Sequence, residues 1–235
     1  MKDLTFIIPT RIETEDRLRN IISSVSYLLK HLPAKVIVKE VSPQSTFKFR
    51  AIPEIKKYAD TTNLTSLFEE TDAPLFCKSK VLNDLIVAAD TKVVANYDAD
   101  CILPVNSYYQ AYEGIEKNKA DVVYPYGCGI YQWKATYDMD IYNQFVQTLS
   151  TDVLDKHKTL SNSTIGWTQF INRQKYIDSY MMNENFISWG CEDNEFNYRM
   201  SILGSRTARV GDSVYHLEHS STDNAWFSYP KFNHN

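Results

Sequence analysis

The segment Lys92-Val93-Val94-Ala95-Asn96-Tyr97-Asp98-Ala99-Asp100 runs from a short apolar stretch directly into two aspartates. A helical pattern precedes it, with apolar residues at helical spacing from Cys77 to Ala89. A short apolar run after a helix is typical of a strand in a parallel sheet, where both faces are covered. Ligands of such sheets bind beyond the carboxyl ends of the strands. The sequence therefore predicts Asp98 and Asp100 at a ligand-binding edge.

The same alternation of strand and helix starts at the N-terminus. Leu4 to Ile8 is an apolar run ended by Pro9, and Lys35 to Val41 has the pattern of a second strand. Between them, apolar residues recur at helical spacing from Glu15, and Pro33 follows the end of the pattern. Strands that alternate with helices imply right-handed crossovers. We therefore expect an α/β fold with an open, mostly parallel sheet flanked by helices.

The pattern in the second half of the chain is less regular, but it still predicts several elements. They are a strand at Asp121 to Pro125, a helix from about Asp138 to Lys158, a strand near Gly166 to Ile171, a helix from Arg173, a helix from Asp193 to Leu203, and one or two short strands from Thr207 to His216. No repeat, low-complexity tract or flexible linker divides the 235 residues. We therefore expect a single domain over residues 1–235.

Composition argues against several partners and cofactors. The net charge of −4 argues against nucleic acid as a partner, since that partner favours a basic face. Neither G-x-G-x-x-G nor G-x-x-x-x-G-K-[ST] occurs, so a bound phosphate would need a cation. The four cysteines form no C-x-x-C pair and are expected to be reduced thiols. The 16 tyrosines and 4 tryptophans suit sugar rings, but they suit ordinary cores equally well.

The first apolar run, Leu4 to Ile8, is too short for a signal sequence or a membrane span. We therefore expect a chain with no transmembrane segment, located in the cytoplasm. A peripheral position at the inner face of the membrane is the alternative.

Two interpretations exist for Asp98-Ala99-Asp100. Aspartate is a favoured turn residue, so an isolated D-x-D motif can be a turn and nothing more. At the end of a parallel strand, two carboxylates can instead bind a divalent cation that bridges a diphosphate. The absence of glycine-rich phosphate loops favours the second interpretation.

Two further segments carry candidate chemistry. Trp189-Gly190-Cys191-Glu192-Asp193-Asn194-Glu195 is a hinge followed by acids at a helix start. Acids there complement the helix dipole, but beside the stacking face of Trp189 a carboxylate could also deprotonate a hydroxyl. His216-Leu217-Glu218-His219 is not a zinc-finger motif. Its imidazoles are either structural or complete the shell of a borderline cation such as manganese.

Five segments, taken in order, form a pattern that resembles a known family. They are Ile8-Pro9-Thr10-Arg11, Phe76-Cys77-Lys78-Ser79-Lys80-Val81-Leu82-Asn83, Asp98-Ala99-Asp100, Ile165-Gly166-Trp167 and Trp189-Gly190-Cys191-Glu192-Asp193. The pattern resembles the beta-1,4-galactosyltransferases and related bacterial family-2-like glycosyltransferases, from Leu4 to about His219. The resemblance implies a GT-A fold, with a nucleotide-sugar-binding half over about 1–103 and an acceptor and catalytic half over about 104–235. It also implies a UDP-sugar donor and manganese, with magnesium as the alternative.

The resemblance assigns roles to individual residues. It places Asp193 at the general base and Glu192 at the acceptor-binding position beside it. Asp100 is expected to bind the metal together with His216 or His219. The donor is expected to contact Pro9, Thr10, Arg11, Glu40, Phe76, Lys78, Asp98, Ala99, Trp189 and Gly190.

This chain departs from the family pattern at three places. The family's W-G-W-G-G-E-D-D-D becomes Ser188-Trp189-Gly190-Cys191-Glu192-Asp193-Asn194-Glu195, which leaves loop mobility and acceptor contacts open. The two histidines match the family spacing only if residues are deleted before them, so which histidine binds metal is also open. Thr164 stands where an aromatic residue crowds the 2-substituent of the donor, so we expect an N-acetylhexosamine to be tolerated.

We expect an inverting transferase that moves a hexose or N-acetylhexosamine of the galactose, N-acetylgalactosamine or glucose type from UDP. The acceptor would be a hydroxyl of a glycan or glycolipid in capsule, lipopolysaccharide or similar polysaccharide synthesis. One alternative is a sugar nucleotidyltransferase, but Pro9-Thr10-Arg11-Ile12-Glu13 lacks the glycine-rich entry loop that it needs. The other is a non-catalytic carbohydrate-binding protein, which has little need for Asp100, Asp193 and a histidine together.

Overall fold

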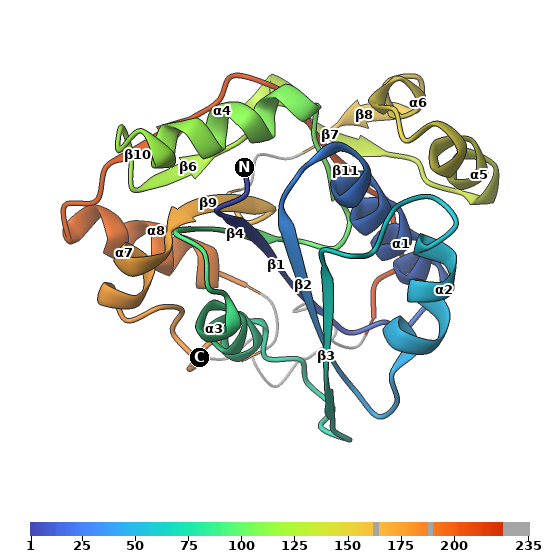
Figure 1. Cartoon of the computed structure of the whole chain (residues 1–235), viewed down its shortest axis with the longest axis horizontal. Helices are drawn as coiled ribbons and strands as arrows, with labels where there is room; N and C mark the ends of the chain where they lie inside the picture. Colours follow the sequence, from blue (N-terminus) through green and yellow to red (C-terminus); the bar gives the residue numbers. More distant parts are fainter. Residues whose placement is uncertain (162–164, 188–189, 223–235) are drawn as a thin grey trace.

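A seven-stranded sheet forms the centre of the computed structural model, which describes residues 1–161, 165–187 and 190–222 (Figure 1). The strands are β1 (Leu4–Thr10), β2 (Lys35–Ser42), β3 (Leu64–Glu70), β4 (Val93–Tyr97), β6 (Val122–Tyr124), β9 (Thr168–Asn172) and β10 (Thr207–Arg209). Their order is β10-β6-β9-β4-β1-β2-β3. Neighbours are parallel except at β9, which is antiparallel to β4 and β6. The predicted α/β fold with an open, mostly parallel sheet is confirmed.

The two central strands, β1 and β4, are buried along their whole length. Coverage on both faces explains why their sequences are continuous apolar runs rather than alternating patterns. The strands run parallel, and their register pairs Leu4 with Val93 and Ile7 with Asn96. Their carboxyl ends therefore open on the same edge of the sheet, where Arg11 and Asp98 follow.

One face of the sheet is covered by α1 (Glu15–His31) and α4 (Val105–Glu116). The rings of Tyr27 on α1 and Tyr108 on α4 lie 6.4 Å apart, and Phe6 of β1 packs edge-on against Tyr108. The helix α1 starts with Glu15 and Asp16, whose charges complement the helix dipole. Most of the apolar residues that recur at helical spacing are buried along α1: Leu18, Ile21, Ile22, Val25 and Leu28.

The opposite face is covered by α3 (Lys78–Ala88), α7 (Arg173–Asp178) and α8 (Glu192–Ile202). Asn96 follows Ala95, the register partner of Phe6, so its side chain points away from the face that Phe6 occupies. There it donates a hydrogen bond of 3.0 Å to the hydroxyl of Tyr176 on α7. The ring of Tyr176 in turn lies 4.9 Å from that of Phe196 on α8. This packing holds α8 against β4 on the face of the sheet opposite to Phe6.

A second, four-stranded sheet was not predicted from the sequence. It contains β5 (Cys101–Ile102), β11 (Val214–Leu217), β7 (Gln132–Ala135) and β8 (Lys158–Leu160), in the order β5-β11-β7-β8. The antiparallel pairing of β11 with β5 sets His216 opposite Cys101, the residue after Asp100. This sheet therefore brings the C-terminal histidine segment to the Asp98–Asp100 turn.

The single helix predicted from about Asp138 to Lys158 was wrong. The structure has two helices, α5 (Met139–Thr148) and α6 (Thr151–Asp155), followed by β8. Leu149 takes a left-handed conformation with φ of 47°, and the Ser150 side chain accepts a hydrogen bond from the amide of Asp152 to start α6. Leucine gives no sequence signal for a left-handed residue, so the break was not visible in the sequence.

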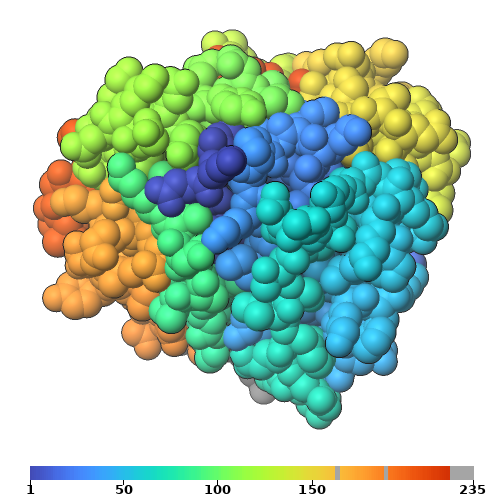
Figure 2. Space-filling model, in the orientation of Figure 1, coloured from blue at the N-terminus to red at the C-terminus, as the bar shows by residue number. Residues whose placement is uncertain are grey.

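The remaining short elements connect the larger ones. They are η1 (Phe47–Ala51), α2 (Ile52–Ile55) and η2 (Gly129–Tyr131). In the space-filling view, the blue-to-cyan N-terminal segments adjoin the green and yellow segments along a continuous boundary (Figure 2). Within the described residues, no helix has the length and apolar character needed to cross a bilayer.

Candidate active site

The Asp98–Asp100 turn is held in place by three separate parts of the chain. The amide of Asp98 donates to the carbonyl of Trp167 at 2.9 Å, and the amide of Leu217 donates to the carbonyl of Asp100 at 2.8 Å. Ser24 on α1 donates its hydroxyl to the carbonyl of Ala99 at 2.7 Å. With its backbone oxygens and amide bound in this way, the turn presents the carboxylates of Asp98 and Asp100 in a fixed direction.

Asp100 and the two histidines form a cluster with the donor atoms of a metal site. The Nε2 atoms of His216 and His219 lie 3.6 and 3.1 Å from the carboxylate of Asp100. One ligand atom from each residue can be chosen so that all three lie within 4.8 Å of one another. One carboxylate and two imidazoles suit a borderline cation such as manganese better than magnesium, which prefers oxygen ligands. The structure thus brings both candidate histidines to Asp100.

The groups around this cluster orient the imidazoles. His219 Nδ1 lies 3.0 Å from the carbonyl of Ser220, and since a carbonyl only accepts, Nδ1 is the nitrogen that carries hydrogen. The ring of Trp167 stacks on that of His216 at 5.4 Å. A hydrogen bond on the far nitrogen and a packed ring are the usual means of aiming a histidine at a metal.

The electrostatics of the cluster favour an ionised Asp100. Burial raises the pKa of Asp100, but the imidazoles of His216 and His219 outweigh this effect and hold the pKa below its usual range. Burial lowers the pKa of His216. Burial also lowers the pKa of His219, but its contact with Asp100 outweighs that effect and raises the pKa above its usual value. The site therefore keeps a negative oxygen beside two nitrogen ligands.

A second group of charges surrounds Lys78, the first residue of α3. Its ammonium lies 2.9 Å from Asp98, 3.7 Å from Glu192 and 3.7 Å from Asp193. The side chains of Lys78, Glu192 and Asp193 are 14%, 2% and 15% exposed. The ammonium of Lys78, which is largely shielded from solvent, therefore joins the end of β4 to the start of α8.

Two carboxylates in this group titrate near neutrality. Burial raises the pKa of Asp193 to about 7, with Glu192 and Asp98 adding to the rise and Lys78 opposing it. Burial likewise raises the pKa of Asp98 to about 6, again opposed by Lys78. A carboxylate with a pKa near the working pH has the proton affinity that a general base needs.

Two residues that had no predicted role hold the carboxylate of Asp193. The side-chain amide of Gln169 on β9 lies 3.5 Å from Asp193 Oδ1 and donates to the carbonyl of Ile165 at 3.2 Å. A Cβ atom at Gly166 would overlap Asp193 Oδ2, so only glycine leaves room for the carboxylate there. The resemblance included Ile165-Gly166-Trp167, but the contact with Asp193 joins residues distant in sequence and gives no local signal.

The predicted nucleotide-contacting residues at the end of β1 lie beside the Lys78 helix. Pro9 and Thr10 are buried at the carboxyl end of the strand. Arg11 donates to the carbonyls of Val41 and Ala73 at 2.8 and 2.9 Å, and its guanidinium lies 5.8 Å from the ring centre of Phe76. These contacts bring Arg11 and Phe76 together.

Glu40 is placed differently from the other predicted donor contacts. Its side chain is fully buried, and its carboxylate accepts from the hydroxyl of Ser45 and from the amides of Thr46 and Phe47 at 2.8 to 3.0 Å. Both carboxylate oxygens therefore accept hydrogen bonds that stabilise the start of η1. The assignment of Glu40 to the nucleotide site gains no support from this arrangement.

The loop before α8 is only partly described. The amide of Gly190 donates to Glu192 Oε2 at 2.9 Å, and Gly190 has a φ of 135°, which suits glycine. Trp189 and Thr164 lie outside the described residues. Their predicted roles in stacking and in donor size stay predictions.

Neither a protein-family model nor a curated protein sequence matches the chain. Solved structures do match its backbone. The mannosyltransferase PcManGT from Pyrobaculum calidifontis, in complex with GDP-Man and Mn²⁺, has a TM-score of 0.59 and 16% identity over 92% of this chain and 56% of its own. S. aureus TarS 1-349, in complex with UDP-GlcNAc, has a TM-score of 0.58 and 15% identity over 95% of this chain and 60% of its own. The chain has a glycosyltransferase fold of the GT-A type.

A third similar structure is the catalytic domain of Drosophila beta1,4galactosyltransferase 7 in complex with xylobiose. Its TM-score is 0.51, with 14% identity over 93% of this chain and 72% of its own. The chain spans less than two thirds of the length of the mannosyltransferase and TarS structures. The similarity therefore concerns the glycosyltransferase fold and not the whole of those proteins.

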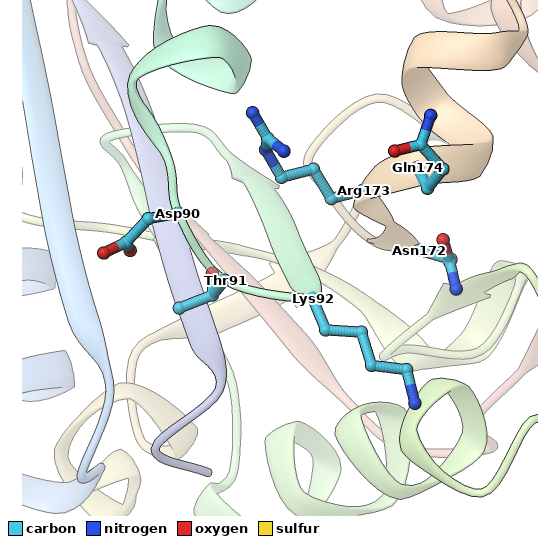
Figure 3. Close-up of a pocket in the computed structure, with 6 residues that line it drawn as sticks. All are labelled: Asp90, Thr91, Lys92, Asn172, Arg173 and Gln174. Carbon is cyan, nitrogen blue, oxygen red and sulfur yellow. The ribbon is translucent and has the colours of Figure 1, made fainter.

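A pocket at the other end of β4 lies outside this site. It has a volume of about 380 Å³. Figure 3 shows the residues that line it: Asp90, Thr91, Lys92, Asn172, Arg173 and Gln174. These residues precede β4 or lie at and beyond the end of the antiparallel β9, so the pocket is at the amino end of β4, away from Asp98. In a glycosyltransferase fold, as in other open α/β sheets, ligands are expected at the carboxyl ends instead.

Proposed function

We propose that this chain is an inverting, metal-dependent glycosyltransferase that uses a UDP-sugar donor and a hydroxyl acceptor on a glycan or glycolipid. The observation that carries the proposal is the convergence of two groups at the end of β4. Asp100 lies with His216 and His219, and Asp98 lies with Lys78, Glu192 and Asp193. A cation site for a diphosphate and a buried base thus flank one turn.

The similar structures support a nucleotide-sugar donor. One of them was solved with GDP-Man and Mn²⁺ and another with UDP-GlcNAc. They support uridine and guanosine donors equally, so the choice of UDP rests on the sequence resemblance. Donors of the galactose, N-acetylgalactosamine or glucose type are proposed on the same ground.

The proposed reaction is a single displacement. The acceptor oxygen attacks the anomeric carbon on the face opposite UDP, and the new carbon–oxygen bond forms as the bond to the UDP oxygen breaks. The bonding electrons leave with UDP, and the hydroxyl proton passes to the carboxylate of Asp193. One displacement of this kind inverts the anomeric configuration.

Other described residues would position the base, hold the adjacent loop and bind the metal. Gln169 and the space at Gly166 aim the Asp193 carboxylate, while Glu192 ties the Gly190 loop to α8 and lies beside the proposed acceptor position. A manganese ion held by Asp100, His216 and His219 would neutralise charge on the departing diphosphate.

A donor panel tests this proposal. The protein is incubated with UDP-galactose, UDP-glucose, UDP-GlcNAc, UDP-GalNAc and GDP-mannose, with manganese or with EDTA, and the released nucleoside diphosphate is measured. We expect release from at least one UDP-sugar, and we expect EDTA to abolish it because the diphosphate then lacks its counter-ion.

The panel also separates the alternatives. Release that is independent of metal, or no release from any donor, would contradict the proposal. A nucleotidyltransferase would instead form pyrophosphate from UTP and a sugar phosphate, and a carbohydrate-binding protein would show no metal-dependent binding of UDP. Use of UDP-galactose with refusal of UDP-GalNAc would contradict the donor tolerance predicted from Thr164.

A further inference from the structure

The position of Lys78 is unfavourable for helix α3 by itself. Lys78 is the first residue of the helix, and no acidic residue stands in that first turn. A cation there opposes the positive end of the helix dipole. The side chain is also only 14% exposed, and burying an ammonium is costly unless carboxylates face it. The reason for a lysine must therefore lie in the groups that surround its ammonium.

Three carboxylates from two other parts of the chain surround that ammonium. Asp98, at the end of β4, is 2.9 Å away, and Glu192 and Asp193, in the first turn of α8, are each 3.7 Å away. Their side chains are between 2% and 26% exposed, and three negative charges in so poorly hydrated a place repel one another strongly without a cation between them. Lys78 thus connects the donor side of the proposed site with its base.

The groups that face Asp193 come from every element packed against it. Asp193 forms an ion pair with Lys78 of α3, and the nearby carboxylates of Asp98 and Glu192 add negative charge. The other polar neighbours are uncharged near neutral pH: Gln169 on β9, and Tyr124, Tyr126 and Tyr176, whose pKa burial raises. The charge state of Asp193 therefore depends on Lys78 more than on any of these neutral groups.

We propose that Lys78 is a positioning residue for the base: its ammonium holds the Asp193 carboxylate in its ionised form and ties α8 to the Asp98 turn. This inference rests on the proposed function, because it assumes that Asp193 accepts the acceptor proton. It differs from the role predicted from the sequence, in which Lys78 contacts the nucleotide. A residue that only bound the donor would change donor KM and leave the base untouched.

The sign of the effect on pH dependence follows from the charges. Burial raises the pKa of Asp193 to about 7, and Lys78 opposes that rise. Removal of Lys78 leaves Asp98 and Glu192 unopposed, so the pKa of Asp193 rises further and more of the base is protonated at neutral pH. Activity then needs a higher pH.

The experiment compares Lys78→Met with wild type over roughly pH 5 to 9, using kcat/KM for sugar transfer or donor hydrolysis. We expect the acidic limb of the profile to move up by at least about one pH unit, the usual effect of losing an opposite charge at this distance. Lys78→Arg should stay near wild type. The control Lys80→Met removes the same charge from an exposed position on the same helix and should leave the limb in place.

A second readout does not depend on activity. In protein labelled with ¹³C at aspartate carboxyls and prepared without metal, the resonance lost in Asp193→Asn identifies Asp193. Its titration midpoint should rise in Lys78→Met. If Lys78→Met does not fold, Glu192→Gln replaces it, and removal of that like charge should lower both the limb and the midpoint.

The outcomes are distinct. The inference is overturned if Lys78→Met raises the donor KM but moves neither the acidic limb of the pH profile nor the titration midpoint of Asp193. It is also overturned if the acidic limb stays in place in Glu192→Gln. A wild-type protein that turns over no donor contradicts the proposed function instead. The midpoint of Asp193 still decides the role of Lys78 in that case.

Discussion

Asp193 and Glu192 are neighbours in sequence, yet the structure holds their carboxylates by different means. Glu192 is 2% exposed and accepts from the amide of Gly190. Asp193 lies against Gly166, just before β9, and against Gln169, within β9. Cys191, with φ of 64°, starts the helix between the loop and these acids. The Asp193 carboxylate, the proposed base, is therefore positioned by residues far from it in sequence.

The contact with Gly166 leads to a sharp prediction. In Gly166→Ala the new Cβ overlaps Asp193 Oδ2, and the backbone there needs no glycine conformation, so the effect is one of space alone. We expect the carboxylate to shift and transfer to fall about 100-fold, the usual effect of misplacing a catalytic group by about 1 Å. Steady-state kinetics of sugar transfer measure this loss.

Metal-dependent UDP binding serves as the internal control, because Gly166 does not contribute to the Asp100 cluster. Gly211→Ala is the matched variant, since a Cβ there meets no atom within 4 Å. Transfer by Gly166→Ala at the wild-type rate would show that Asp193 is not the base, or that its position does not matter.

At the scale of elements, Glu40 shows how a predicted contact can belong to the fold instead. It lies near the carboxyl end of β2 and accepts from the hydroxyl of Ser45 and from the amides of Thr46 and Phe47, where η1 begins. Helix starts leave amides without partners, and a buried carboxylate satisfies them. Sequence patterns do not distinguish such a cap from a ligand contact, because both place an acid at a strand end.

We therefore predict that Glu40→Ala lowers the free energy of unfolding by about 2 to 4 kcal/mol, since buried amides lose their acceptor. Chemical denaturation measures this change, and Glu70→Ala, at the exposed end of β3, should stay within about 0.5 kcal/mol of wild type. In Glu40→Gln, which keeps one oxygen, donor affinity should equal that of wild type. A large loss of donor affinity in that variant, with stability unchanged, would return Glu40 to the nucleotide site.

Across the whole chain, local apolar patterns predicted β1, α1, β2, α3 and β4, but they did not predict β3 (Leu64–Glu70) or α4 (Val105–Glu116). Leu4 to Ile8, the helix from Glu15 and the strand before Asp98 are each defined by apolar spacing within a few turns or residues. The four-stranded second sheet was missed because β5 and β8 are only two and three residues long. Both histidines and Asp100 were predicted from the sequence as candidate metal ligands, but only the β11–β5 pairing shows how they come together. The Lys78 cluster depends on charges from three distant segments, which no local pattern contains.

Calorimetry of UDP binding with and without manganese, on wild type, Asp100→Asn and Asp193→Asn, tests the proposed metal site most directly. Wild type should bind UDP only with the metal, because Asp100 and the histidines would hold the cation that meets the diphosphate. Asp100→Asn should lose at least about tenfold in affinity, and Asp193→Asn should keep near wild-type affinity. UDP binding that is indifferent to manganese and to Asp100→Asn would contradict the proposed metal site.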